Sequence, residues 1–409
     1  LSQYSDESVA AVGVVNQIVM FAFLIFEVIN IGTSVLCSQY LGAGMRNKMV
    51  QVVGVSLLLN LVVGLVVSAI LHYGATTLLG WMGLRPELLK YGIGYMEIVG
   101  AFAFFQAISL TISASLRSAN KAISPMLVTV LVNVMNIIGN YSLIFGKFGF
   151  PQLGIAGAAI GSSLAELVSV IFFIIYTWKR IDCKKYALNI LPKFQSRTLK
   201  RILNVSVWTM IQNFVSLSTW FMFFRFVEHL GERSLAIANI IRNVSGIPFM
   251  IAMAFAATCG SLVSNLIGAG EKDCVRGTIN QHIRIGYVFV LPILIFFCLF
   301  PDLILRIYTD MPDLRDASIP SLWVLCAAYV VLVPANVYFQ SVSGTGNTRT
   351  ALAMELCVLT IYVAYATYFI LYLKMDIAFA WTTESVYGIF ILLFCYWYMK
   401  KGNWQKKKI

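Results

Sequence analysis

Charged residues are scarce in this chain of 409 residues, at 12% of the total, and histidine occurs only three times. So little charge excludes an ordinary soluble domain, in which about a quarter of the residues are charged. The eight cysteines show no Cys-x-x-Cys spacing, so a metal cluster or a disulfide framework has no support and we expect packing cysteines. No nucleophile with a neighbouring base is visible either, so we expect a protein that is not an enzyme and needs no cofactor.

What the sequence does contain is apolar. Hydrophobic residues make up 59% of the chain and the mean hydropathy is +0.81, which indicates an integral membrane protein. Runs near twenty residues recur, and lipid leaves no partner for free backbone groups, so each run predicts a membrane-spanning helix. The predicted spans are Ala10–Ser38, Val50–Tyr73, Leu88–Leu116, Pro125–Phe145, Leu153–Trp178, Ile202–Phe226, Ala236–Ser264, Thr278–Phe300, Ala317–Val342, Thr350–Tyr372 and Ile377–Met399.

The chain also matches itself at an offset of 226 residues, most clearly where Leu36–Gly44 repeats as Leu262–Gly270. The two copies stay in register from about residue 4 to residue 125. The second copy has a further span before it, Ile202–Phe226, so we expect the matching first helix to be largely absent from this chain. Restoring it gives an all-α protein of twelve helices in two six-helix repeats, and because six is even the repeats must be parallel.

This repeat predicts a domain organisation. We expect an N-terminal lobe at residues 1–180 with a truncated first helix, a linker at 181–201, a C-terminal lobe at 202–400 and a basic tail at 401–409. Lys and Arg concentrate in the loops that hold the Gly-Ala-Gly turns, the linker and the tail, which the positive-inside rule places in the cytoplasm with both termini. A basic inner face beside anionic lipid is then a sufficient explanation of the net charge of +12, and no nucleic-acid partner is expected.

Ionisable residues inside spans are rare and functional by default, because each is costly in hydrocarbon. Glu27 lies in the middle of its span, and Glu166 and Glu384 lie on the last spans of the two halves. A carboxylate at such a place could bind a proton or Na⁺, or it could brace a neighbouring helix. Glu97 and Glu355 lie near span ends, where snorkelling or helix bracing is the favoured interpretation.

Neutral polar residues add a second set of candidates. Asn133, Asn136 and Asn140 are spaced by three and four residues, which places them on one stripe of one helix. Such a stripe either holds helices together or lines a wet cavity. Polar residues of other spans favour the cavity. There we expect substrate to contact Gln17, Asn30, Gln106, Asn133, Gln212, Asn213, Arg242 and Glu384.

Several segments resemble the multidrug and toxic compound extrusion (MATE) transporters, and in particular their DinF-like bacterial branch. The segments are Ser38–Gly44, Leu116–Met126, Asn136–Gly146 and Ser343–Thr350, and the similarity extends over essentially the whole chain. The resemblance implies two six-helix lobes around a central cavity in the bacterial inner membrane. It also implies alternating access, with export of organic cations or amphipathic drugs driven by H⁺ or Na⁺. We expect a monomer whose partners are small molecules and the bilayer.

The resemblance carries over incompletely. The family's acidic residue on the fifth helix matches Asn140, and the asparagine one turn earlier matches Asn136. Glu27 or Glu166 therefore has to supply the charge for ion coupling in the first half. A flippase for lipid-linked oligosaccharides or cell-wall precursors remains the alternative, although it would want a strongly basic cavity. A channel would want a symmetric polar ring, and the repeats differ at their polar positions.

Overall fold

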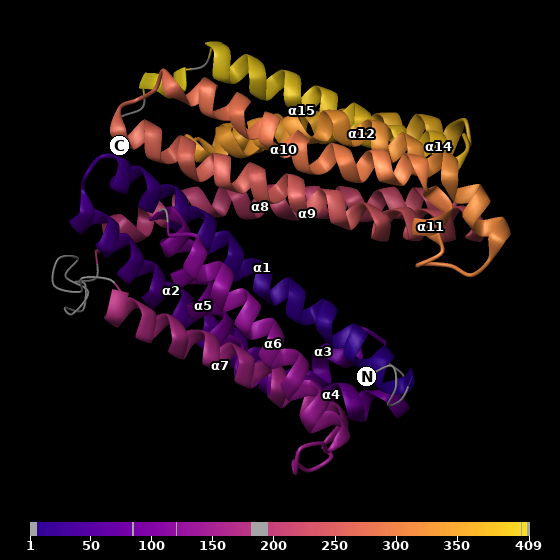
Figure 1. Cartoon of the computed structure of the whole chain (residues 1–409), viewed down its shortest axis with the longest axis horizontal. Helices are drawn as coiled ribbons and strands as arrows, with labels where there is room; N and C mark the ends of the chain where they lie inside the picture. Colours follow the sequence, from indigo (N-terminus) through magenta and orange to yellow (C-terminus); the bar gives the residue numbers. More distant parts are fainter. Residues whose placement is uncertain (1–5, 84–85, 120, 181–194, 402, 407–409) are drawn as a thin grey trace. The chain divides into compact units, whose positions relative to one another are not determined.

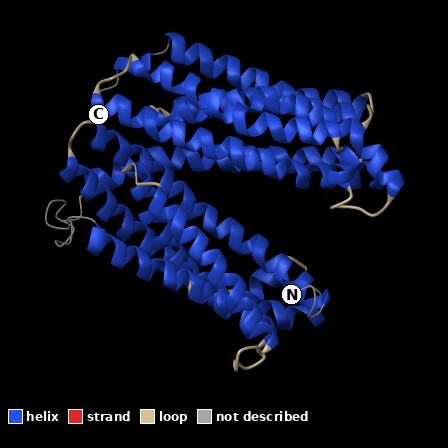
Figure 2. Cartoon of the chain, viewed as in Figure 1, coloured by secondary structure: helices blue, strands red, loops and turns tan. Residues whose placement is uncertain are grey.

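The computed structural model describes residues 6–83, 86–119, 121–180, 195–401 and 403–406, and the regular structure of these residues is entirely helical (Figures 1 and 2). The helices of the first half are α1 (Asp6–Gly42), α2 (Arg46–Tyr73), α3 (Ala75–Trp81), α4 (Pro86–Ala101), α5 (Ala103–Ser118), α6 (Ile123–Phe145) and α7 (Gly154–Arg180). Those that follow are α8 (Ser196–Glu228), α9 (Glu232–Ala269), α10 (Cys274–Leu299), α11 (Pro301–Leu305), α12 (Pro312–Gly344), α13 (Thr348–Ala366), the π-helix η1 (Thr367–Tyr372), α14 (Ile377–Ala380), α15 (Thr382–Lys401) and the short 3₁₀-helix η2 (Asn403–Lys406).

These helices are those of a multi-pass membrane protein, which confirms the predicted fold class. Nine helices of the described residues are long and apolar enough to cross a bilayer, and a bent pair of helices adds a tenth span. The predicted span Ile202–Phe226 lies within α8, which has 33 residues but is not among these nine. Its polar and charged residues lower its mean hydropathy, although its length of about 50 Å at 1.5 Å per residue exceeds a hydrocarbon core.

The bent pair corrects one prediction. We expected a single helix over Leu88–Leu116, but this segment breaks near Phe102, where two helices meet with a bend of 45°. The backbone N–H of Phe104 donates to Ser68 Oγ of α2 at 3.1 Å, so a side chain takes over a donor that the break releases. The break is a feature of the first half, because the matching residues of the second half lie in the uninterrupted helix α12.

The sequence repeat is also a repeat of helices. Adding 226 to the bounds of α1 gives 232–268, and α9 is Glu232–Ala269. The same shift moves α2 to 272–299, beside α10 at Cys274–Leu299, and moves the bent pair from 86–118 to 312–344, the bounds of α12. The helices that share a repeat position therefore share their ends as well.

By its internal contacts the chain divides into two compact units. The first unit comprises Leu1–Leu41 and Met45–Ser206, and the second comprises Gly42–Gly44 and Val207–Ile409. The boundary falls inside α8, after Ser206, whereas the sequence predicts a linker over residues 181–201. Residues 181–194 of that linker lie outside the described part, and residues 196–201 are the first residues of α8. Of the predicted tail, residues 402 and 407–409 also lie outside it.

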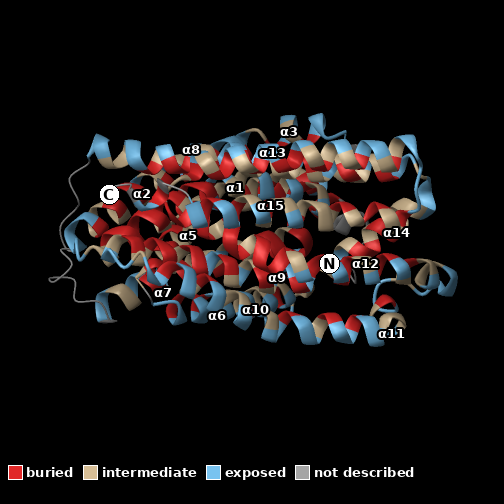
Figure 3. Ribbon diagram, turned by 90° about the horizontal axis from the view of Figure 1, so that it is seen from above, coloured by how far each residue is buried: buried red, intermediate tan, exposed pale blue. Residues whose placement is uncertain are grey.

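Each unit has its own apolar core. In the first unit Phe26, Met96 and Ala159 are fully buried and belong to α1, α4 and α7. In the second, Ile241 of α9 and Leu322 of α12 are fully buried in the largest cluster. Buried residues line the helix faces that meet other helices, while exposed ones occupy outer faces and turns (Figure 3).

One helix–helix contact of the repeat is formed by different residues in the two units. In the first unit Ser34 of α1 and Ser118 of α5 form a hydrogen bond between their hydroxyls at 2.8 Å. The matching residues of the second unit are Gly260 and Gly344, and a Cβ added at Gly344 would collide with the backbone of Gly260. α9 and α12 therefore pack backbone to backbone, as small residues permit in membrane helices.

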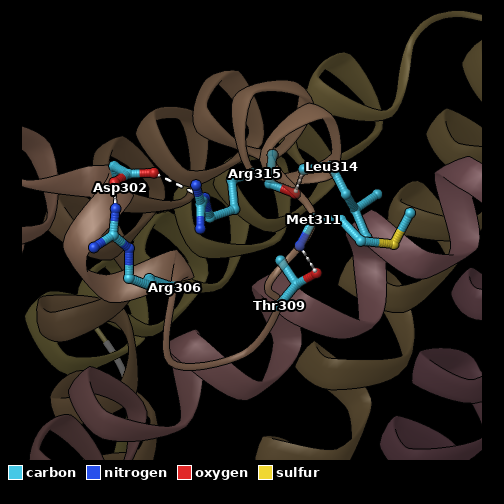
Figure 4. A network of polar contacts seen from close by, with 7 residues as sticks. Asp302, Arg306, Thr309, Met311, Leu314 and Arg315 are labelled. Atoms are coloured by element: carbon cyan, nitrogen blue, oxygen red, sulfur yellow. Dashed lines mark hydrogen bonds and ion pairs between the residues drawn. The ribbon is translucent and has the colours of Figure 1, made fainter.

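An ion-pair network closes the end of the second unit at which α11 meets α12 (Figure 4). Asp302 of α11 lies 2.9 Å from Nε of Arg315 on α12, and 3.4 Å from Arg306, the residue that directly follows α11. The Asp302 carboxylate thus holds the short helix α11 against the start of α12.

Candidate functional site

The first polar site joins α5 and α7 of the first unit, where two residues predicted from the sequence meet. With its amide oriented to suit its neighbours, the side-chain nitrogen of Gln106 donates to both carboxylate oxygens of Glu166 at 2.6 Å. Three residues further along both helices, the hydroxyls of Ser109 and Ser169 are 2.5 Å apart. Glu166 therefore has neutral neighbours on a seam of polar contacts within membrane-spanning helices.

The asparagine stripe of α6 faces α7 in part. Ser162 of α7 donates to Asn136 Oδ1 at 2.9 Å. Asn140 packs against Gly161 of α7, and its buried Oδ1 has no hydrogen-bond partner among the described residues. Asn133, on the same stripe, is exposed. The structure thus places two of the three asparagines at a helix contact and the third outside it.

A second polar cluster of the first unit is fully buried. The Nδ2 of Asn60 on α2 donates to Asn30 Oδ1 on α1 at 3.0 Å and lies 2.7 Å from the Thr111 hydroxyl of α5. Asn30 was predicted as a site residue, whereas Asn60 and Thr111 were not. Two buried atoms, Asn30 Nδ2 and Asn60 Oδ1, have no partner within the described chain.

Two predicted residues of α1 are exposed. Glu27 and Gln17 both lie on the surface of this helix. The charge of Glu27 interacts with Arg117 of α5, whose Nη1 donates to Ser113 one turn earlier at 3.1 Å. Glu27 is therefore the predicted carboxylate that has a cation nearby.

In the second unit the most buried carboxylate is Glu355 of α13, at 2% exposure. Its Oε1 accepts from the hydroxyl of Ser216 on α8 at 2.7 Å and from that of Tyr387 on α15 at 3.0 Å. The sequence analysis placed Glu355 near a span end and favoured snorkelling or helix bracing there. Its burial excludes snorkelling, and its hydrogen bonds to α8 and α15 agree with helix bracing. α13 begins at Thr348, and its neighbours α8 and α15 cover Glu355.

Glu384 of α15 belongs to the same region. Tyr362 of α13 donates to Glu384 Oε1 at 3.2 Å, and the rings of Tyr362 and Tyr387 meet edge to face with centroids 6.4 Å apart. The two tyrosines therefore link the carboxylates Glu355 and Glu384. Sequence spacing hides this link, because the helices that carry the four residues pair only in the folded chain.

The remaining predicted residues of the second unit lie on α8 and α9. Gln212 is 8% exposed, its Oε1 has no partner among the described residues, and its carbonyl accepts from Ser216. Asn213 beside it is half-buried. Arg242 of α9 is half-buried too, and its guanidinium lies over the rings of Trp220 and Phe224 at 5.8 and 5.3 Å.

Three intramembrane carboxylates, Glu166, Glu355 and Glu384, thus have amide or hydroxyl partners. None of the four ion pairs found among the described residues involves them. Comparison with known proteins shows where this pattern belongs. The MatE family model matches residues 1–142 and 209–368. The chain belongs to the MatE family. The resemblance of the sequence motifs to MATE transporters is therefore confirmed, while the DinF-like branch stays a prediction.

Curated relatives of this MatE protein are named as a transporter or as multidrug resistance proteins. An uncharacterised transporter, YisQ, from Bacillus subtilis is 28% identical over 360 residues, which cover 87% of this chain and 78% of the relative. A probable multidrug resistance protein, NorM, from Thermotoga maritima is 26% identical over 412 residues, covering 100% of this chain and 88% of the relative. The relatives are transporters rather than enzymes.

Solved structures share the fold. An outward-facing multidrug resistance MATE family transporter of the MOP superfamily gives a TM-score of 0.88 at 20% identity, covering 98% of this chain and 88% of that one. A MOP superfamily transporter from Pyrococcus furiosus gives 0.87 at 19% identity, with coverage of 100% and 90%. At these identities the match establishes the architecture of the MatE fold.

Proposed function

We propose that this protein is a cation-coupled antiporter that exports organic cations or amphipathic drugs across the bacterial inner membrane by alternating access. The relatives named as multidrug resistance proteins support drug export and do not favour the flippase alternative. The basic loops support an orientation with both termini in the cytoplasm. We propose a monomer as the working unit, because each half carries its own polar site.

One observation carries the coupling proposal. Glu166, Glu355 and Glu384 stand on membrane-spanning helices with neutral amide or hydroxyl partners. A carboxylate locked to an arginine keeps its charge, but one held by neutral donors can take up and release a proton or a metal cation. The ion would be H⁺ or Na⁺, and no other cofactor is required.

The partners also explain how ion binding can alter helix packing. The Oε1 atom of Glu355 accepts two hydrogen bonds from different helices, α8 and α15. Protonation or a bound cation at this atom competes with those hydrogen bonds and therefore changes the contact of α13 with both neighbours. Coupling to drug export needs only that ion and drug differ in affinity for the two facing states.

The first unit offers a second coupling site at Glu166, with Glu27, Asn136 and Asn140 as further candidates. Gln106 presents one nitrogen to both oxygens of Glu166, so a cation that arrives must displace or share this amide. Our candidates for contacts with substrate remain Gln17, Asn30, Gln106, Asn133, Gln212, Asn213, Arg242 and Glu384.

The test uses purified protein in proteoliposomes, with ethidium as the exported cation and an imposed gradient of H⁺ or of Na⁺. We expect ethidium to move in the direction opposite to the flow of one of the two ions. This movement should stop when an ionophore dissipates the gradient of that ion. Ethidium movement that is independent of both gradients would contradict the proposal.

Variants then separate the carboxylates. We expect Glu166→Gln and Glu355→Gln each to lower gradient-driven efflux by about tenfold, since coupling energies are typically 1–3 kcal/mol. Glu228→Gln is the matched control, because Glu228 is exposed at the end of α8 and pairs with Arg225. If Glu27→Gln and Glu166→Gln both leave H⁺-driven efflux intact, the first unit does not hold the titrating group.

A further inference from the structure

Arg242 is an arginine within a predicted membrane span, and its surroundings are aromatic. It lies ten residues into α9, and its guanidinium is 5.3 Å from the ring centroid of Phe224 and 5.8 Å from that of Trp220. Both rings belong to α8 and are one helical turn apart. Their centroids are 4.8 Å apart in an edge-to-face arrangement, so the pair forms a fixed aromatic shelf beneath the cation.

This cation has no carboxylate partner in the described chain. The ion pairs found there join Arg225 to Glu228, Arg233 to Asp313, and Asp302 to Arg306 and Arg315. In the same unit, buried Glu355 takes its hydrogen bonds from Ser216 and Tyr387, and half-buried Glu384 takes one from Tyr362. Ring faces attract a cation but leave its N–H donors unused, because they offer no lone pairs.

The charge is specific to the second unit. The residue that matches Arg242 at the 226-residue offset is Asn16, a neutral side chain that accepts from the Tyr95 hydroxyl at 3.5 Å. A residue needed only to hold this helix position can be neutral, as the first unit shows. Arg242 therefore adds a positive charge that the shared architecture does not require.

We propose that Arg242, Trp220 and Phe224 form a binding subsite for the anionic group of an aromatic amphipath, such as a carboxylate or a sulfonate attached to a ring system. The guanidinium fork supplies paired N–H donors to the two oxygens, and the indole and phenyl rings pack against the adjacent aromatic body. This rests on the proposed export function and extends its substrates from cations to anionic and zwitterionic aromatic compounds. A lipid phosphate offers the same anionic chemistry, so the experiment separates the two sources.

The experiment measures equilibrium binding of two matched dyes to the protein in phosphatidylcholine vesicles, without any gradient. Anilinonaphthalene sulfonate carries the anion, and phenylnaphthylamine has the same aromatic body without it. We expect Arg242→Gln to weaken binding of the sulfonate by about tenfold, the loss that corresponds to one charge-assisted contact, and to leave phenylnaphthylamine unchanged. Arg284→Gln, which removes an exposed arginine of α10, is the control and should change neither.

Two results would overturn the subsite: equal changes for both dyes, or an unchanged affinity for the sulfonate in Arg242→Gln. Arg242→Lys provides a second measurement if the glutamine variant does not fold. It keeps the charge without the planar fork, and we expect a smaller, anion-selective loss. Adding phosphatidylglycerol tests the lipid source: a fall in sulfonate affinity that occurs in the wild type and vanishes in Arg242→Gln would assign Arg242 to a lipid headgroup and overturn the substrate subsite.

Gradient-driven ethidium export in the same vesicles distinguishes the two proposals. If ethidium export fails while sulfonate binding depends on Arg242, the antiporter proposal fails alone. If ethidium is exported normally and Arg242→Gln leaves sulfonate binding unchanged, the subsite fails alone.

Discussion

Tyr387 donates its hydroxyl to Glu355 at 3.0 Å from Oε1 and 3.2 Å from Oε2, which joins α15 to α13 through a carboxylate that is 2% exposed. Such a bond both satisfies a buried acid and couples two helices. A proton or a cation at Glu355 would therefore change the contact between these two helices.

Removing the Tyr387 hydroxyl tests this coupling. Tyr387→Phe keeps the ring and deletes one of the donors to Glu355, at a cost of about 1–3 kcal/mol for a hydrogen bond to a charged group. We expect gradient-driven ethidium export to fall by about tenfold and its ion dependence to shift, whereas Tyr372→Phe, at an exposed residue, should change neither. Wild-type ion dependence in Tyr387→Phe would show that Glu355 is structural.

The amide of Gln106 should matter in the same way for the first unit. Gln106→Leu removes the donor to both oxygens of Glu166 while it keeps an apolar side chain of similar size. We expect lower ion-coupled export without loss of folded protein, measured in proteoliposomes and by size-exclusion chromatography. Gln281→Leu, at an exposed residue of α10, is the control. Equal export by the two variants would count against a role for Glu166.

The cluster around Asn60 predicts a difference in stability between the units. Asn60→Ala leaves the buried Asn30 Oδ1 and the Thr111 hydroxyl without their shared donor, and we expect a loss of about 1–3 kcal/mol. The matching residue of the second unit is Gly286, where an added Cβ would meet Val333 Cγ1 at an ordinary 3.4 Å, so Gly286→Ala should be nearly neutral. Thermal unfolding in detergent measures both.

The same cluster permits a compensation test. The second unit has Ala256, Gly286 and Val337 where the first has Asn30, Asn60 and Thr111. Replacing Asn30, Asn60 and Thr111 together with these counterparts removes all the polar side chains of the cluster, so none of them is left without a partner. We therefore expect this triple variant to lose less stability than the sum of its single substitutions, and additive losses would contradict this account.

The bend near Phe102 gives a further stability prediction. Ser68→Ala deprives the Phe104 N–H of its acceptor, and we expect a loss of about 1–3 kcal/mol in unfolding free energy. Ser218→Ala on α8 is the control, because that serine is exposed and bonds only to a carbonyl of its own helix. A neutral Ser68→Ala would mean that the freed N–H finds another partner.

Much of the fold could be predicted because its causes are local or repeated. Apolar runs of about twenty residues indicate membrane helices whatever their neighbours, and the 226-residue repeat carried the helix ends from one half to the other. The bend of the α4–α5 pair could not be predicted. Gly100 lies two residues before Phe102, but glycines also occur inside the unbroken helix α2, and the acceptor of the freed N–H lies on α2. The ends of α8 could not be predicted from hydropathy, because charged residues near both ends of this helix lower the local hydropathy.

The candidate site was predicted in part. Gln106, Glu166, Asn136 and Asn30 were selected as polar residues of apolar spans, and the structure gives each a polar partner on another helix. Glu355 was set aside because it lies near a span end, where snorkelling or helix bracing is favoured, yet the structure buries it. The helices that cover it, α8 and α15, lie far from it in sequence.

The sequence by itself therefore determined that this is a duplicated, all-helical membrane protein of the MatE family, because hydropathy and repetition are written along the chain. Only the tertiary structure decided which polar residues work together. A buried carboxylate depends on donors from other helices, so Glu355, Ser216 and Tyr387 become one site only when α8, α13 and α15 pack. The same packing set Arg242 on its aromatic shelf rather than beside an acid.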